Sequence, residues 1–233
     1  MTFRSAVLLL VFPALSGAGC AFGPGEPFGT ISPTLSARVD QDSGFTRLAT
    51  GYEVRITAAT FGVDALRLVG TTDEGSGQTL LEIPAGVPLI ALSDDPEAVG
   101  TVPLTCDPSC GVDRGQLEAV QADLTSFEVV AEVRDSQTPA RIAAGTYTVH
   151  FVASSSAEGR PLKTAVSLPF DEQHFPHVAL DAALVGTPQM FEGVDFAALT
   201  GTTLDATQNT AARDAVLEAF AATALDVHTR RSP

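Results

Sequence analysis

Histidines are the side chains in this sequence best suited to bind a metal ion. His174 and His177 lie in a predicted loop just before a predicted strand, so their imidazoles can converge on one ion. His150 lies on another predicted strand, opposite its apolar row, and joins them only if that side lines a site. Copper and zinc sites need three or four ligands at about 2.0–2.3 Å. These three histidines are therefore a candidate copper or zinc site; the alternative is that His174 and His177 are exposed loop residues.

Two cysteines stand close together in the middle of the chain. Cys106 and Cys110 are separated by Asp107, Pro108 and Ser109, which are residues typical of turns. In an oxidising compartment such a pair is typical of a small local disulfide. Closing so short a loop removes little entropy from the unfolded chain, so the disulfide is expected to fix a loop and not to hold the fold together. The alternative is a thiolate metal or redox site.

No recognised catalytic motif is present. Residues 40–44 begin like a calcium-binding loop, but Gly51 occupies the twelfth position, where a bidentate Glu belongs. The sequence lacks G-x-S-x-G, H-E-x-x-H and the glycine patterns that bind nucleotide phosphates. We therefore expect no catalytic residue and no enzymatic activity.

The first nineteen residues have the organisation of a signal peptide. Arg4 supplies a basic start, residues 6–15 form a short apolar stretch, and small residues occupy positions 16–19. The apolar stretch is too short for a permanent membrane helix, which needs about twenty residues. The sequence therefore predicts that residues 1–19 direct export.

Cys20 directly follows this segment, which resembles a bacterial lipoprotein signal. Ala18 and Gly19 match the family pattern, whereas Gly17 stands where Leu is usual. The resemblance implies that Cys20 receives diacylglycerol and fatty acids such as palmitate, and that this lipid is the membrane anchor. Because Ala21 follows Cys20 in place of a retaining Asp, the resemblance favours the outer membrane or a periplasm-facing location in the bacterial envelope. The alternative is an ordinary secretory signal that is cut near Ala18.

Composition limits the class of partner. The chain has 13 Lys and Arg against 28 Asp and Glu, and its net charge is −15. Such a chain repels nucleic acid, so we expect no nucleic-acid partner. The sequence has no Trp and two Tyr, which weakens the case for a carbohydrate or peptide groove built on large aromatic side chains.

Residues 34–233 are expected to form one domain, an antiparallel β-sandwich. Residues 20–33 are rich in Gly and Pro and predict a flexible tether from the lipid to this domain. Strands are indicated by alternation of apolar and polar side chains within residues 52–57, 127–133, 147–153 and 178–184. Turn residues separate these segments every ten to twenty positions, as in sandwich folds.

Two segments have helical spacing. Residues 210–225 are rich in Ala and carry Val216 and Phe220 on one stripe, which predicts a C-terminal helix packed on the sandwich. In residues 113–124, Leu117, Val120 and Leu124 also fit a helix, although a turn followed by a strand fits equally well.

The last ninety residues resemble lipid-anchored β-sandwich proteins of the MbnP-like, copper-associated periplasmic class. The resemblance rests on the strands at residues 147–153 and 162–170, on the stretch from Val178 to Phe196, and on the helix with Phe220. That class binds copper through His and an oxidised Trp. Because this chain has no Trp, the resemblance transfers only His174 and His177, and it implies fold and compartment more than activity.

Two functional hypotheses follow. The first is an exported, lipid-anchored, non-enzymatic protein that interacts with another envelope protein or has a structural role there. The second is a periplasmic lipoprotein that binds copper, zinc or a small ligand through His174, His177 and His150.

Overall fold

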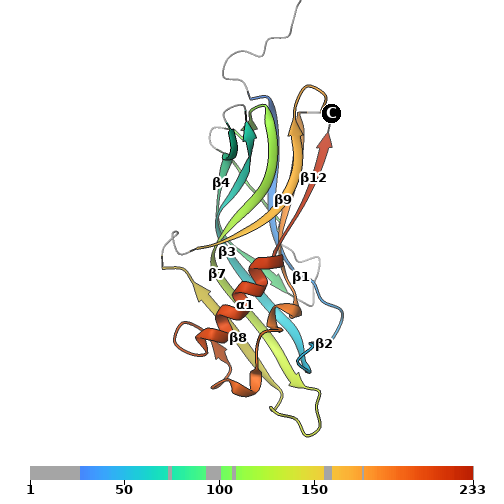
Figure 1. The fold of residues 1–233 in the computed structure, drawn as a ribbon, viewed down its shortest axis with the longest axis vertical. Helices are drawn as coiled ribbons and strands as arrows, with labels where there is room; N and C mark the ends of the chain where they lie inside the picture. Colours follow the sequence, from blue (N-terminus) through green and yellow to red (C-terminus); the bar gives the residue numbers. More distant parts are fainter. Residues whose placement is uncertain are drawn as a thin grey trace, which may run out of the picture.

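The fold is built from two β-sheets, one of which runs along most of an elongated molecule (Figure 1). The computed structural model describes residues 27–72, 75–92, 101–106, 109–154, 159–174 and 176–232. The predicted signal peptide, Cys20 and the first part of the predicted tether lie outside these ranges. The prediction of a mainly β fold with a C-terminal helix is confirmed.

The larger sheet is organised around two strands of 21 residues each, β3 and β7, which pair along their whole length. One half of this pair is flanked by β4 and β9, and the other half by β2, β8 and β11. Its strands are β2 (Thr46–Arg47), β3 (Tyr52–Thr72), β4 (Gly75–Leu92), β7 (Gly115–Asp135), β8 (Gly145–Val152), β9 (Arg160–Phe170) and β11 (Thr203–Leu204). Between β2 and β4, the Gln41 side chain hydrogen-bonds both backbone groups of Ile56 and so takes the place of a missing neighbour.

The smaller sheet has the order β12-β10-β1-β5, and β6 also pairs with β1. Its strands are β1 (Gly29–Val39), β5 (Val102–Pro103), β6 (Gly111–Val112), β10 (His177–Gly186) and β12 (Leu225–Ser232). β1 and β10 run parallel from Thr30 to Val39, and β8 and β11 are also parallel. The prediction of an entirely antiparallel sandwich is therefore wrong in this respect, and the sheets are mixed.

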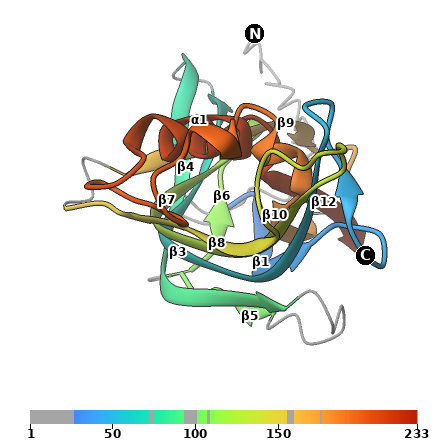
Figure 2. The same cartoon turned by 90° about the horizontal axis from the view of Figure 1, so that it is seen from below.

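The core lies between the sheets and under the C-terminal helix. The predicted inward rows are buried, among them Val54 and Ile56 on β3 and Val129 and Ala131 on β7. Helix α1 (Thr210–Thr223) lies along one face of the larger sheet (Figure 2). Its Phe220 stacks on Phe61 and meets Phe127 edge-on, with ring centroids 5.1 and 4.8 Å apart. The 3-10 helices η2 (Pro188–Phe191) and η3 (Phe196–Ala198) add buried aromatic side chains to the same layer.

The structure decides one open alternative and corrects one local prediction. For residues 113–124 the turn followed by a strand is confirmed, because β7 begins at Gly115. The predicted tether of residues 20–33 is too long, because β1 begins at Gly29 and its Ile31 is buried in the core. The strand forms in spite of its Pro33 because β10 pairs with it on one side and β5 and β6 on the other. Within the described ranges, no helix has both the length and the apolar composition needed to span a bilayer.

Candidate functional site

The structure places the three predicted metal ligands on separate elements with separate partners. The His174 imidazole is hydrogen-bonded to Asp171, with Nδ1 and Oδ1 2.6 Å apart, and this bond helps to hold the pKa of Asp171 below its usual value. His177 opens β10 and is hydrogen-bonded through Nδ1 to the Thr30 hydroxyl at 2.6 Å. His150 lies on β8, in the other sheet. Among the residues that the structure describes, no group of three or more His, Cys, Asp or Glu side chains is placed to hold a metal ion.

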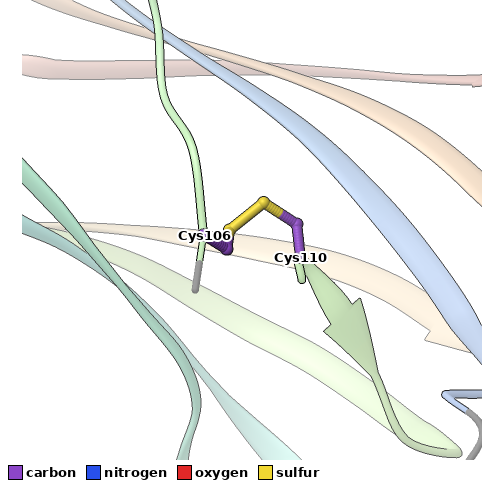
Figure 3. The surroundings of a disulfide bond; sticks show 2 residues. All are labelled: Cys106 and Cys110. Atoms are coloured by element: carbon purple, nitrogen blue, oxygen red, sulfur yellow. A yellow bond between two sulfur atoms is a disulfide. The ribbon is translucent and has the colours of Figure 1, made fainter. Parts of the chain in front are cut away.

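Cys106 and Cys110 form a disulfide between β5 and β6 (Figure 3), with their Cα atoms 5.0 Å apart. Both short strands pair with β1, so the disulfide fixes the connection between two neighbours of one strand. The paired sulfur atoms carry no free thiolate in this structure. The prediction of a local disulfide is confirmed in the structure.

The strongest candidate site is a hollow on the outer face of the larger sheet, the face opposite α1. Two adjoining depressions of about 250 and 320 Å³ meet there and share Ser126 in their walls. We call this hollow the outer trough; it is lined by Thr60, Gly62, Ser126, Glu128, His150 and Val152. These residues come from β3 and from the consecutive strands β7 and β8, which lie far from β3 in the sequence.

Strand register brings the lining residues into two rows. In the first row, Thr60 of β3 lies opposite Glu128 of β7, which lies opposite His150 of β8. In the second row, Gly62 lies opposite Ser126, which lies opposite Val152. Since side chains alternate between the two faces of a strand, both rows face away from the core.

The trough is shallow and open because its floor carries little side-chain volume. A Cβ atom at Gly62 would overlap the Ser126 hydroxyl, so glycine at this position lets that hydroxyl lie over β3. The Ser126 hydroxyl is therefore turned toward β3 and away from His150 on β8. A serine–histidine pair for nucleophilic catalysis needs the two side chains within hydrogen-bonding reach, and this arrangement does not provide it.

Apolar side chains border the trough on both sides. Ile90 of β4 lies opposite Thr60, and Ile90 is 55% exposed to solvent. Val152 lies on the other side and is 59% exposed. In the part of the chain that the structure describes, these are the two large hydrophobic residues that are exposed. Their position on either side of one hollow is typical of a binding surface and not of scattered exposure.

Acidic side chains dominate the surroundings of the trough. Glu128 lies in its wall, and its carboxylate makes no ion pair with another described residue. Asp64 lines the second depression and is exposed. Nearby, Arg67 pairs with Glu82 at 2.9 Å and also with Asp123, so its charge is already engaged.

His150 lies next to a second acid at the far edge of the sheet. The pKa of Asp205 lies below its usual value, chiefly because its carboxylate accepts hydrogen bonds from the backbone N–H and hydroxyl of Thr207. The nearby His150 lowers it further. His150 is thus placed between Asp205 and Glu128, the acid opposite it on β7.

A second hollow, of about 280 Å³, lies where Tyr52 meets the loop after β7. The buried Tyr52 hydroxyl donates a hydrogen bond to Asp195 at 2.9 Å and accepts one from the Ala197 N–H at 3.2 Å. Burial and, after it, the hydrogen bond to Asp195 raise the pKa of Tyr52. Arg141 lies 4.0 Å from the centre of the Tyr52 ring and is bound to both carboxylate oxygens of Asp135. These side chains use their hydrogen-bonding groups and charges on one another. The cluster therefore links β3, the β7–β8 loop and η3.

Sequence reasoning found one member of the outer trough, His150, and assigned it to a different site. Among the other members, Gly62 is a glycine inside β3 and so marks the close approach of its neighbour, but it lies beyond the strand predicted within residues 52–57. The cluster of Tyr52, Arg141 and Asp195 gave none, because its members are distant in the sequence and ordinary in type.

Comparison with known proteins found no matching family model, no matching curated protein and no matching solved structure, so the resemblance to MbnP-like proteins stays a prediction.

Proposed function

We propose that the chain is an exported, lipid-anchored β-sandwich protein of the bacterial envelope that acts by binding another envelope protein and not by catalysis. The observation that carries the binding function is the outer trough with Ile90 and Val152 exposed on its two sides. Large apolar side chains that gather at one hollow are costly to leave in water, and they mark interaction sites in soluble domains.

The export half of the proposal is supported by the N-terminal segment and by the disulfide. Residues 1–19 have the order of charge, apolar stretch and small residues that signal peptides have, and Cys20 follows directly. A disulfide between Cys106 and Cys110 persists in an oxidising compartment. Both features favour a location outside the cytoplasm.

The anchor is tested by the mass of the mature N-terminus. In a bacterial host, the wild-type chain is expected in the membrane fraction, beginning at Cys20 and carrying the mass of diacylglycerol and a fatty acid. Cys20→Ala is expected to lose that mass and the membrane association. Gly17→Leu, which restores the usual residue of the signal, is the matched control and is expected to be processed at least as completely. An unmodified N-terminus produced by cleavage near Ala18 would contradict the anchor.

The binding function is tested with a photo-crosslinking side chain placed at Val152 in the membrane-bound protein. We expect a discrete crosslinked product that is lost when Ile90→Ser is added. The same crosslinker at Glu218, an exposed residue of α1, is the control and is expected to give no such product. Equal products from both positions, or none from Val152, would contradict binding at the trough.

A further inference from the structure

We infer that the outer trough takes an extended, basic segment of a partner protein, with a small apolar side chain seated over Gly62. This inference rests on the proposed binding function and names the chemistry of the partner. It follows from three properties of the trough: its shape, the spacing of its acids and the net charge around it.

The shape favours an extended chain. The floor at Gly62 and Ser126 carries little side-chain volume, and the borders are the apolar side chains on β4 and β8. Those two strands are three strand spacings apart, which is about 14 Å. A single extended segment fits between such borders, because an extended chain takes up about 5 Å across the strand direction. A short apolar side chain of that segment then lies above the floor formed by Gly62 and Ser126, between the apolar borders.

The spacing of the acids matches the repeat of an extended peptide. Glu128 lies opposite Thr60, and Asp64 lies four residues farther along β3, beyond a register irregularity between Gly62 and Val63. Four residues of a regular strand span about 13 Å, which is the upper bound of this separation along β3. In an extended peptide, residues one, three and five point to the same side. A peptide with basic residues at positions one and five and an apolar residue at position three therefore places its charges at the two acids and its apolar side chain between them.

The charge around the trough favours a basic partner and excludes an acidic one. Arg67 interacts with Glu82, Asp123 and Asp64, so this single cation faces three acids and leaves an excess of negative charge near the trough. The chain as a whole carries a net charge of −15. A basic segment is therefore attracted over a distance and held at two points, and its binding weakens as salt screens these charges.

The test uses a fluorescent peptide, acetyl-Gly-Lys-Thr-Val-Thr-Lys-Gly-amide. The protein is the full chain after processing by the host cell, purified in detergent. Binding is measured by fluorescence anisotropy at low salt. We expect Glu128→Gln and Ile90→Ser each to weaken binding at least fivefold. Glu218→Gln, which removes the same charge from the exposed face of α1, is the matched control and is expected to change binding less than twofold. Thermal melts check that each variant is folded.

Four results would overturn the inference. Equal weakening by Glu218→Gln and Glu128→Gln would mean that only the overall charge attracts the peptide. Equal binding of a peptide with Gly in place of its Val would show that no apolar side chain is seated over Gly62. Equal binding of a peptide with Glu in place of its Lys would show that the acids of the trough do not attract it. A dimer in sedimentation that Ile90→Ser converts to monomer would make this face an interface between copies of the chain.

The two proposals fail separately. If crosslinking at Val152 succeeds and the peptide does not bind, the trough binds a partner of other chemistry and the proposed function stands. If the peptide binds and Cys20 is not acylated, the surface inference stands and the anchor is wrong.

Discussion

Gly62 and Ser126 face each other across β3 and β7 so closely that a side chain on one displaces the side chain of the other. The openness of the outer trough depends on this contact. It is a property of two single residues, and it is directly accessible to substitution.

Gly62→Ala is expected to destabilise the domain by about 1–3 kcal/mol, the usual cost of overpacking. The added Cβ overlaps the Ser126 hydroxyl. Ser126→Ala removes that hydroxyl and leaves the Ser126 Cβ 3.3 Å from the new atom, so the double variant is expected to recover most of the loss. Urea unfolding of the four proteins measures the coupling.

Gly145→Ala is the control for this cycle, because a Cβ there meets only the edge of Tyr147 at 3.7 Å. We expect no significant destabilisation at this position. Additive losses from Gly62→Ala and Ser126→Ala would show that the two residues are not in the predicted contact.

Asp135 is the residue whose charge is most strongly stabilised by its surroundings. Its side chain is fully covered, and hydrogen bonds from Arg141 hold the pKa of its carboxyl well below the usual range. A lowered pKa in the folded state contributes stability at pH values above the unfolded pKa of about 3.9, and this contribution is lost as the pH falls below that value.

We therefore expect Asp135→Asn to lower Tm at pH 7, and to do so progressively less as the pH falls below about 4. Thermal unfolding monitored by circular dichroism between pH 7 and pH 2 measures the difference. Glu218→Gln, on the exposed face of α1, is the comparison and is expected to follow the wild type throughout. A constant Tm difference at all pH values would show that the carboxylate charge plays no part.

At the scale of elements, α1 buries Val216, Leu217 and Phe220, and the Phe220 ring contacts the larger sheet. Phe220 is 1% exposed and lies against Phe61 and Phe127. Phe220→Ala removes the ring from a packed interior and is expected to cost about 3–5 kcal/mol. Chemical denaturation measures the loss. Glu218→Ala, on the exposed side of the same helix, is expected to stay within about 0.5 kcal/mol, and a similar loss there would contradict the assigned orientation of the helix.

β7 shows why local patterns identified most elements and left one undecided. Strict alternation at residues 127–133 predicted a strand, and the structure confirms it. At the start of the same strand, a register irregularity between Leu117 and Ala119 lets both Ala119 and Val120 be buried. This extra residue changes the spacing of the apolar positions from two to three, which is the spacing of a helix. A bulge is set by pairing with the neighbouring strands, so residues 113–124 alone could not distinguish the two structures.

At the scale of the whole molecule, the net charge of −15 sets the electrostatic balance. Repulsion among excess carboxylates destabilises the compact state, whereas each exposed ion pair contributes only about 0–1 kcal/mol. Salt screens both effects. At this net charge we expect the repulsion to outweigh the ion pairs, so we expect Tm to rise by a few degrees between about 10 mM and 300 mM NaCl. Sucrose at matched osmolality is the control. A fall in Tm with NaCl would mean that the ion pairs outweigh the repulsion.

Long-range pairing explains what the sequence could not predict. Two parallel pairs, β1 with β10 and β8 with β11, join segments that are separated by other strands in the sequence, and no local pattern encodes such neighbours. The outer trough has the same origin, because Gly62, Ser126 and Val152 become neighbours only through the register of three strands. The helix at residues 210–225 was predictable because helical spacing is local, and α1 ends only two residues before the predicted end.

The position of β1 determines how the domain responds to force. On the proposal that Cys20 carries the lipid, tension on this anchor enters the domain at Gly29, where β1 begins, and runs along the strand. The hydrogen bonds to β10 from Thr30 to Val39 lie across that direction, so they are loaded together and do not open one after another. Tension on the proposed N-terminal anchor thus loads these hydrogen bonds in shear. When a partner pulls on the outer trough, we expect the domain to unfold slowly under that force, instead of opening one hydrogen bond at a time.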